Sequence, residues 1–322
     1  MGSGARFASI DVGTNTLRLL IAELSGEALV PVVYERAITR LGGGYTPEGG
    51  LAPDSQERAL KALEGFRTVI DETGGVEEVY AVATSVVRRA GNRDDFTRGA
   101  GERAGITIDV ITGDEEARLS LLGVRSVIES GTSPLLVMDI GGGSTEFMAS
   151  GDGGIEGAWS MELGVVHLTE DHLASDPPKK AELFRVRGEV RAVLEDLTGR
   201  MKSAGVDPAR FSASSGALFV GTAGTVTTLA ALDQDLDEYD RDRINNYRLT
   251  RENAEVILEE LASMTIEERG RILALEKGRE DLIVPGALIT LEVMDEFGFT
   301  EMVVSDAGLL EGVIMDRAGG RA

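Results

Sequence analysis

Two short stretches of the chain combine carboxylates, glycines and hydroxyls at a spacing that suits phosphate chemistry. In "SIDVGTNTLRLL" (9–20) an apolar strand ends at Asp11, and in "VMDIGGGSTEF" (137–147) another ends at Asp139. The turns that follow contain Gly13, Thr14 and Asn15 in the first stretch, and Gly141, Gly142, Gly143, Ser144 and Thr145 in the second. Backbone amides of such turns bind anions, hydroxyls add donors, and a carboxylate at a strand end can hold Mg²⁺. One copy is an ordinary hairpin turn, whereas two copies predict a pair of phosphate loops.

The elements around these loops occur in one order twice. Three strands are expected over the first 40 residues, and helices then alternate with strands. From 134 a second run of three strands leads into helices, a glycine-rich turn and a closing strand and helix. The pattern predicts two similar α/β domains, 5–127 and 128–306, facing across an interdomain cleft, with the final helix (307–318) a candidate to pack back on the first. Ligands of such folds lie at the carboxyl ends of strands, where both aspartates fall.

The composition excludes several kinds of protein. The 322 residues contain no Cys and only two His, so thiol catalysis, zinc–thiolate sites and multi-histidine metal cages are excluded. We expect His167 and His172 to be structural or solvent-exposed. The net charge of −23 argues against a nucleic-acid partner. No apolar run approaches the ~18–20 residues of a membrane span, and none of signal-peptide length precedes the first strand, so we expect no membrane partner and a cytoplasmic protein.

The motifs of other phosphate-binding folds are missing from the sequence. It contains neither GxGxxG nor GxxxxGK[ST], which removes the dinucleotide-binding and P-loop interpretations. Neither strand-end aspartate is followed two positions later by a second Asp, which argues against aspartyl-phosphate chemistry. Hydrolysis would therefore depend on carboxylates, hydroxyls, backbone amides, arginines and a bound metal.

Six motifs together resemble those of the exopolyphosphatase / guanosine pentaphosphate phosphohydrolase family. They are "DVGTNTLRLL", "ATSVVRRAGN", "GDEEARLSLLGV", "DIGGGSTEF", "GTAGTVTTLAAL" and "VSDAGLLEGV". They follow the family order over about residues 6–316. The family belongs to the superfamily of sugar kinases, actin and heat-shock chaperone ATPases. The resemblance therefore implies two actin-like (ribonuclease H-like) α/β domains.

The resemblance also implies roles for individual residues. Asp11 and Asp139 are similar to the carboxylates that organise Mg²⁺, or Mn²⁺ in its place, and the two turns are similar to phosphate-cradling loops. Glu146 resembles a carboxylate near the metal and the water. Arg88 resembles a phosphate ligand, and Glu116 resembles the proposed general base.

The residues around Glu116 leave two interpretations open. A helix from 114 places an apolar stripe toward the core, formed by Ala117, Leu121, Val124 and Ile128. Glu116 lies about 100° from the first stripe residue, above Ser120 and Gly123, which suits a carboxylate lining a cleft. Alternatively the helix carries surface ion pairs, and we expect these of Glu115 and Asp114 with Arg118.

Two further motifs have functional and structural interpretations. One of two neighbouring arginines usually points outward, so we assign Arg88 to the site and Arg89 to solvent. The loop "GTAGTVTT" (221–228) either packs a helix closely on a strand or, as in the superfamily, lies near a nucleotide. Its candidates for contact with a nucleotide or a distal phosphate are Gly221, Thr222, Gly224 and Thr225.

The chain departs from the family pattern in two places. Arg18 stands where many relatives have His, and it would add fixed positive charge if it faces the cleft. Larger relatives carry further C-terminal domains that help grip long polyphosphate, so a preference for short chains is expected here. Relatives are commonly dimers, and we expect a homodimer.

We predict Mg²⁺-dependent release of terminal orthophosphate from linear polyphosphate. The alternative is removal of the 5′ γ-phosphate from guanosine pentaphosphate, since the loops would serve either substrate. A second alternative is an ATP-binding kinase or nucleotide switch of the same superfamily. The "EEAR" helix fits the phosphohydrolase branch better than the kinase or chaperone branches.

Overall fold

The chain forms two compact units. The computed structural model describes residues 5–25, 28–129, 134–151 and 154–319. Unit 1 contains the described residues up to Gly123 and those from Gly308 onward, and unit 2 is Val124–Ala307. The sequence pattern predicts a domain boundary between 127 and 128, whereas unit 2 begins at Val124. It predicts that the final helical segment begins at 307, whereas unit 1 resumes at Gly308.

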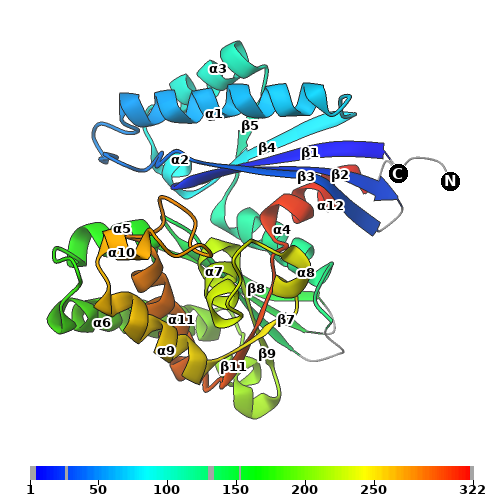
Figure 1. Cartoon of the computed structure of the whole chain (residues 1–322). Coiled ribbons are helices and arrows are strands. Elements are labelled where there is room, and N and C mark those ends of the chain that lie inside the picture. Colours follow the sequence, from blue (N-terminus) through cyan, green and yellow to red (C-terminus); the bar gives the residue numbers. More distant parts are fainter. Residues whose placement is uncertain (1–4, 26–27, 130–133, 152–153, 320–322) are drawn as a thin grey trace. The chain divides into compact units, whose positions relative to one another are not determined.

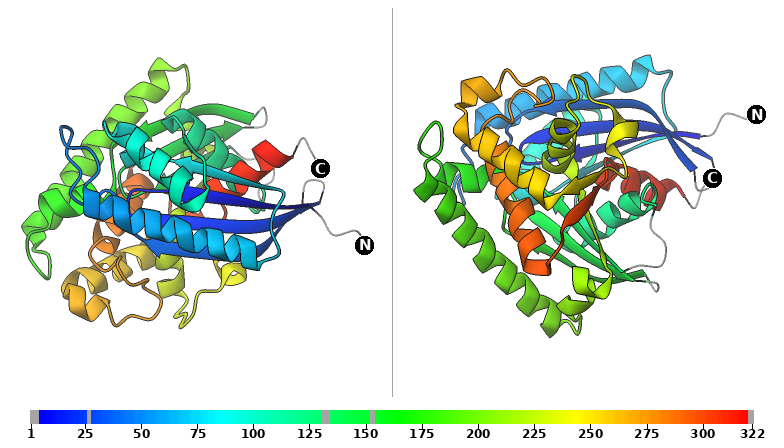
Figure 2. Two further views of the ribbon diagram at one scale, coloured as in Figure 1. Left: turned by 90° about the horizontal axis from the view of Figure 1, so that it is seen from above. Right: turned by 60° about the horizontal axis from the view of Figure 1, so that its bottom comes forward.

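Unit 1 is built on a five-stranded sheet of order β3-β2-β1-β4-β5. The first three strands are antiparallel neighbours, while β4 and β5 run parallel to β1. Figure 1 shows α1 and α3 on one side of this sheet and α12 on the other, and both views in Figure 2 show α1 lying along the strands. Its elements are β1 (Ala5–Val12), β2 (Thr16–Ser25), β3 (Ala28–Ile38), α1 (Pro53–Glu72), β4 (Glu78–Ala83), α2 (Ser85–Arg89), α3 (Arg93–Ala104), β5 (Ile108–Val110), α4 (Gly113–Arg125) and α12 (Leu309–Ala318).

Strand β1 is buried on both faces, and its alternation decides where the first aspartate lies. Ile10 and Val12 join the core under α1 and α3, whereas Phe7 joins the core under α12. Side chains alternate between the two faces of a strand. Asp11 therefore shares the α12 face with Phe7 and with Ser9, whose hydroxyl donates to the Leu310 carbonyl at 2.8 Å.

Unit 2 repeats this arrangement with additions. Its six-stranded sheet has the order β10-β11-β9-β6-β7-β8. The elements are β6 (Leu135–Ile140), β7 (Thr145–Gly151), β8 (Gly154–Met161), α5 (Val165–His172), α6 (Lys180–Ser203), two 3₁₀ turns (Pro208–Phe211 and Ala213–Ser215), β9 (Leu218–Thr222), α7 (Ala223–Asp233), α8 (Arg241–Ile244), β10 (Arg248–Thr250), α9 (Arg251–Ser263), α10 (Ile266–Arg269), α11 (Ile283–Phe297) and β11 (Glu301–Val304).

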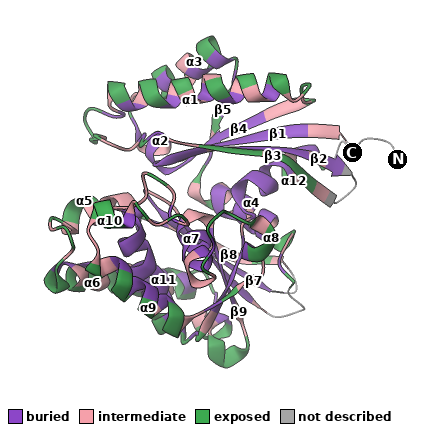
Figure 3. Ribbon diagram, viewed as in Figure 1, coloured by how far each residue is buried: buried purple, intermediate pink, exposed green. Residues whose placement is uncertain are grey.

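The two sheets correspond strand by strand. In each, an antiparallel three-strand meander is followed by two strands parallel to its first: β4 and β5 join β1, and β9 and β11 join β6. Helix α11 contacts α6, α7 and α9 and is buried along nearly its whole length, as Figure 3 shows. The predicted fold class, two similar actin-like (ribonuclease H-like) α/β domains, is confirmed for each unit. No helix in the described part of the chain is long and apolar enough to cross a membrane.

The helical stripe predicted around Glu116 is also confirmed. Ala117, Leu121 and Val124 in α4, and Ile128 just beyond it, are all buried. Short elements such as α2 and the edge strand β10 do not follow from the sequence pattern. The five residues of α2 and the three residues of β10 are too few for a hydrophobic period to be recognised in the sequence.

Helix α4 packs against α12 with backbone touching backbone. A Cβ added at Gly312 would lie 1.8 Å from the Leu119 carbonyl oxygen, and one at Gly123 would lie 1.9 Å from that of Gly308. Any side chain at these positions would force the helices apart. The glycine at 123 thus has a packing reason, where the sequence suggested a cleft below Glu116.

Gly312→Ala should therefore destabilise the protein. We expect a loss of about 1–3 kcal/mol in the free energy of unfolding, the usual effect of overpacking a rigid contact. Chemical denaturation followed by circular dichroism measures it. Gly101→Ala in α3 is the matched control, because an added Cβ meets nothing within 4 Å there. That variant should gain about 0.5–1 kcal/mol. Equal effects of the two changes would contradict the close α4–α12 contact.

Candidate active site

The first phosphate loop is a tight turn between β1 and β2. The Gly13 amide donates to the Thr16 carbonyl at 3.2 Å, and a Cβ on Gly13 would lie 2.8 Å from that oxygen. Only glycine fits such an approach. The segment after β3 supports the turn from outside: the Asn15 carbonyl accepts from the Thr39 and Arg40 amides at 3.0 and 2.9 Å.

The second loop, between β6 and β7, has the same geometry. The Gly141 amide donates to the Ser144 carbonyl at 2.9 Å, and a Cβ on Gly141 would again lie 2.8 Å from the acceptor. The Gly142 carbonyl accepts from the Val166 amide at 2.9 Å, in the first turn of α5. A Cβ at Gly164 would lie 2.2 Å from the Gly142 oxygen, so that glycine is required as well. The loop is therefore held against the start of α5.

The predicted phosphate-binding residues divide by exposure. Gly141 and Gly142 are half-exposed, whereas Thr145 is completely buried and its hydroxyl donates to the Leu163 carbonyl at 2.5 Å. The Ser144 hydroxyl donates to Glu146 at 2.8 Å. These two hydroxyls shape the loop, and the backbone amides are the groups that remain to receive phosphate. In the first loop Thr14 and Asn15 are also buried, with 5% and 8% of their surface exposed.

The carboxylate of the first loop is held by an arginine. Asp11 and Arg18 are register partners on β1 and β2. The Nε and Nη2 groups of Arg18 both donate to Asp11 Oδ2, at 3.0 and 2.7 Å. The other oxygen, Asp11 Oδ1, is buried and has no hydrogen-bond partner among the described residues. Arg18 therefore acts on Asp11 directly, and one acceptor is left for a cation or a water molecule.

The second loop replaces this ion pair with two carboxylates. Asp139 is the register partner of Glu146, and Glu146 is that of Ser160 on β8. Glu146 Oε1 accepts from the hydroxyls of Ser144 at 2.8 Å and Ser160 at 2.7 Å. The sequence reading missed Ser160. Ser160 can be recognised as a neighbour of Glu146 only when the register of β7 and β8 is known.

These groups fit a hard divalent cation that keeps part of its water. No cluster of three or more His, Asp or Glu side chains able to hold a metal occurs in the part of the chain that the structure describes. Mg²⁺ commonly takes one or two carboxylates and completes its shell with water and phosphate oxygens. Asp139 with Glu146, and the unpartnered oxygen of Asp11, supply that kind of donor.

The candidate base is paired with the candidate phosphate ligand. Arg88, at the end of α2, donates through Nη1 to Glu116 Oε2 and to the Ile111 carbonyl, each at 3.0 Å. Only 10% of the Glu116 side chain is exposed, against 24% of the Arg88 side chain. The guanidinium that contacts Glu116 comes from 28 positions away in the sequence, on another helix.

The neighbours of these two residues behave differently. Glu115 pairs with Arg118, which also reaches Asp316 on α12, and the Arg118 guanidinium lowers the pKa of Glu115 below its ordinary value. This pair was predicted. Arg89 was expected in solvent, but it is half-buried and its guanidinium lies over the Tyr45 ring, 5.5 Å from the centroid. That expectation was wrong because a cation–π contact was available.

Sequence comparison agrees with this set of loops and carboxylates. Residues 20–320 match the sequence profile of the Ppx/GppA phosphatase family. The chain belongs to this family. The resemblance drawn from the six motifs is thereby confirmed, and membership favours an enzyme that hydrolyses phosphate bonds over a nucleotide switch.

Individual Ppx/GppA proteins are similar over the whole chain. Exopolyphosphatase 2 of Mycobacterium tuberculosis is 35% identical, with 98% of this chain and 99% of that protein aligned. The crystal structure of an exopolyphosphatase from Cytophaga hutchinsonii has a TM-score of 0.87 at 27% identity, covering 98% of both chains. The Aquifex aeolicus PPX-GPPA enzyme has a TM-score of 0.78 at 31% identity, covering 97% of this chain and 99% of that one.

The third predicted loop, at the start of α7, has mainly packing roles in this Ppx/GppA chain. The Thr222 hydroxyl donates to the Ala307 carbonyl at 3.0 Å, and a Cβ on Gly221 would collide with Met302. Thr225 packs on Gly286. Gly224 is different, because the Arg279 side chain lies against it.

An arginine that the sequence reading missed lies against this loop. A Cβ on Gly224 would fall 1.3 Å from Arg279 Nη1, so the guanidinium occupies the space that a side chain would need. Arg279 also forms an ion pair with Glu276 at 2.8 Å. Ala223, between Thr222 and Gly224, has a φ of +70°, a strained conformation for a residue with a Cβ. Beside its packing contacts, the loop therefore has the Arg279 guanidinium against Gly224 and a strained backbone at Ala223.

Both histidines lie on α5, the helix whose first turn contacts the second loop. His172 pairs with Glu189, and His167 is half-buried on the same helix, α5.

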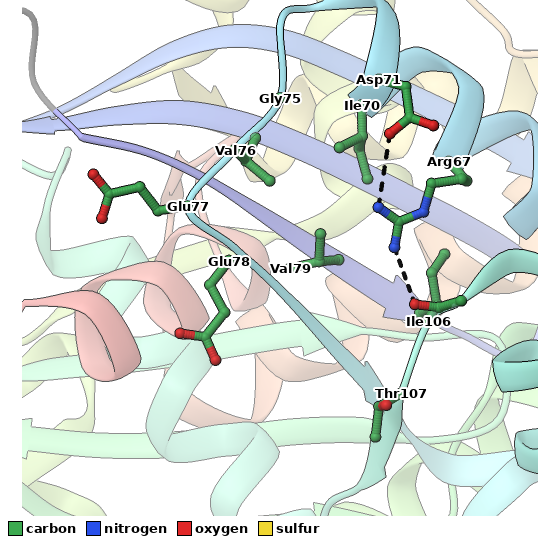
Figure 4. A pocket seen from close by; sticks show the side chains of 11 residues that line it. Arg67, Ile70, Asp71, Gly75, Val76, Glu77, Glu78, Val79, Ile106 and Thr107 are labelled. Carbon is green, nitrogen blue, oxygen red and sulfur yellow. Dashed lines mark hydrogen bonds and ion pairs between the residues drawn. The ribbon is translucent and has the colours of Figure 1, made fainter.

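A cavity of about 480 Å³ lies at the start of β4, where Arg67 donates to the Gly105 carbonyl at 3.0 Å and lies 3.9 Å from Asp71 (Figure 4). Asp11 pairs with Val82 toward the other end of that strand. The cavity is therefore remote from the first loop.

Ser160→Ala tests how far Glu146 depends on its neighbours. The change removes a hydroxyl donor to a buried carboxylate, and we expect a loss of about 1–2 kcal/mol in the free energy of unfolding. Ser263→Ala is the control, because that exposed hydroxyl donates only to the Glu260 carbonyl. The control should stay within about 0.5 kcal/mol of wild type. Equal losses in denaturant titrations would mean that Glu146 does not rely on Ser160.

Proposed function

We propose that this Ppx/GppA enzyme is an exopolyphosphatase that releases terminal orthophosphate from linear polyphosphate in a Mg²⁺-dependent reaction. The observation that carries the proposal is the pairing of Glu116 with Arg88 in the unit that contains the first aspartate–glycine loop, where β1 runs parallel to β4, the strand before α2. In this proposal Glu116 is the general base, and its partner is a guanidinium suited to phosphate. The naming of Exopolyphosphatase 2, aligned over 98% of the chain, supports the substrate class.

The loops and arginines bind and neutralise the phosphate chain. Backbone amides of the glycine turns donate to phosphoryl oxygens without side-chain reorganisation. Arg88 adds a fixed positive charge close to Glu116. Such positioning and charge stabilisation supply most of the acceleration in phosphoryl transfer. The overall charge of −23 would repel a polyanion, so these local donors have to reverse the field at the site.

Glu116 takes the proton in the chemical step. The oxygen of a water molecule forms a bond to the terminal phosphorus, and one of its protons moves to the Glu116 carboxylate. The bridging P–O bond breaks, and its electron pair stays on the oxygen of the shortened chain. Mg²⁺, or Mn²⁺, would be held by Asp139 and Glu146 in unit 2, and Asp11 offers a donor of the same kind in unit 1; the ion would supply charge neutralisation when bound.

Substrate assays with two variants test this function. Phosphate release from short polyphosphate, long polyphosphate and guanosine pentaphosphate should be highest on polyphosphate, with short chains favoured. Glu116→Gln should lower kcat on polyphosphate by about 10²–10⁴-fold, the usual worth of one acid–base group.

Glu115→Gln is the control for that assay, because Glu115 pairs with Arg118 away from Arg88. It should retain nearly wild-type turnover, and circular dichroism should show both variants folded. Faster release from guanosine pentaphosphate than from either polyphosphate would replace our proposal with the alternative, a guanosine pentaphosphate phosphohydrolase. A Glu116→Gln enzyme with more than about a tenth of wild-type kcat would remove Glu116 as the base.

Metal dependence should follow the difference between the two loops. Asp139 stands beside a second carboxylate, whereas Asp11 is paired with Arg18. We expect chelator to abolish turnover and Asp139→Asn to weaken Mn²⁺ binding about tenfold to a hundredfold, more than Asp11→Asn does. Electron paramagnetic resonance titration with Mn²⁺ measures the affinities. Undiminished turnover in excess chelator would contradict the metal requirement, and an equal loss in both variants would contradict the assignment to the second loop.

A further inference from the structure

The guanidinium of Arg88 bonds to the described part of the chain through one nitrogen. Nη1 donates both to Glu116 Oε2 and to the Ile111 carbonyl at 3.0 Å. Among the residues that the structure describes, Nε and Nη2 of Arg88 have no hydrogen-bond partner, and 24% of the side chain is exposed. A guanidinium is planar and presents its donors in a rigid fork, so donors at one edge can be occupied while others receive a second anion.

We propose that Arg88 connects the base to the substrate, with Nη1 holding Glu116 while Nε and Nη2 bind an oxygen of the terminal phosphoryl group. Arg88 thereby becomes a positioning residue for Glu116 in addition to a phosphate ligand. The inference rests on the proposed phosphatase function and specifies how its base and its substrate are kept at a constant separation.

The alternative is that the arriving phosphate draws Arg88 away from Glu116. That would break the ion pair of a carboxylate with only 7% of its residue surface exposed, beside a polyanion. Breaking a buried pair by removing one partner is strongly destabilising. Keeping Nη1 in place costs nothing comparable and adds favourable charge on both sides of the guanidinium. Electrostatics therefore favours a bridge over an exchange.

The backbone supports the bridge as well. The Ile111 carbonyl, which accepts the second bond from Nη1, lies five positions before Glu116, and the Glu116 amide donates to the Thr112 carbonyl at 2.9 Å in the first turn of α4. Arg88 is therefore attached to both ends of one short segment. Its orientation relative to the carboxylate is set by two contacts, which limits rotation of the fork.

Arg88→Lys is the variant that separates bridging from simple binding. An ammonium group keeps the charge for phosphate but is a point donor that lacks the planar fork. We expect KM for polyphosphate to stay within about threefold, and kcat to fall about tenfold to a hundredfold, because a small misplacement of a reacting group has that effect. Arg118→Lys is the matched control, since Arg118 holds Glu115 on the same helix at 2.9 Å. It should leave both constants nearly unchanged.

The same substitution in the Glu116→Gln background shows whether Arg88 acts through the base. With no base left to position, Arg88→Lys should lower the residual kcat by no more than about threefold, so the two effects will not add. A second variant, Arg88→Ala, allows chemical rescue. Millimolar guanidinium chloride should raise its kcat several-fold, whereas methylammonium chloride at the same concentration should not. Thermal unfolding curves establish that each variant is folded.

Each result decides for or against the bridge. A raised KM with unchanged kcat in Arg88→Lys would overturn it and leave Arg88 a phosphate ligand only. A full loss of kcat that persists in the Glu116→Gln background, or rescue by methylammonium as effective as by guanidinium, would overturn it as well. A wild-type enzyme that releases no phosphate from polyphosphate would instead overturn the proposed function, and this inference would fall with it.

Discussion

The tight turn after each strand-end aspartate is the constraint on which the rest of the site depends. In both units a glycine amide closes the turn on a carbonyl three residues later, and the space beside it excludes a Cβ. A turn this short fixes the register of the strands that it joins. The residue seven positions after each aspartate is consequently its direct cross-strand neighbour: Arg18 for Asp11 and Glu146 for Asp139. The length of each turn therefore decides which side chain lies opposite the aspartate.

The same backbone supports opposite chemistry in the two units. In unit 1 the aspartate faces a cation, so the pair is close to neutral and leaves one acceptor oxygen on Asp11. In unit 2 two carboxylates occupy adjacent strands, and serine hydroxyls satisfy one oxygen of Glu146. Two like charges at neighbouring positions are unfavourable unless a cation compensates them. A duplicated hairpin can thus be specialised for anion binding or metal binding by changing one residue on β2 or β7.

Local patterns explain how much of this could be read from the sequence. The loops, the α/β order and the buried stripe of α4 all depend on residues within a few positions of one another, and periodicity reveals them. The Arg18 contact could also have been inferred, since Arg18 and Glu146 stand at the same distance from their aspartates. The ion pair of Arg88 with Glu116 could not have been inferred, because nothing in the sequence indicates that a side chain of α2 contacts a side chain of α4. Arg89 shows the same limit, since its ring contact with Tyr45 depends on tertiary packing.

The C-terminal helix connects the helix of Glu116 with the strand before the first loop. Helix α12 touches the backbone of α4 at Leu119, one turn after Glu116, through Gly312. Its Leu310 carbonyl accepts from Ser9, two residues before Asp11 on β1. Helix α12 thus contacts both α4, which carries Glu116, and β1, which carries Asp11. Packed interiors transmit displacement because they contain few voids. A shift of α12 would move Glu116 and Asp11 together, and their separation would be maintained by packing at both contacts.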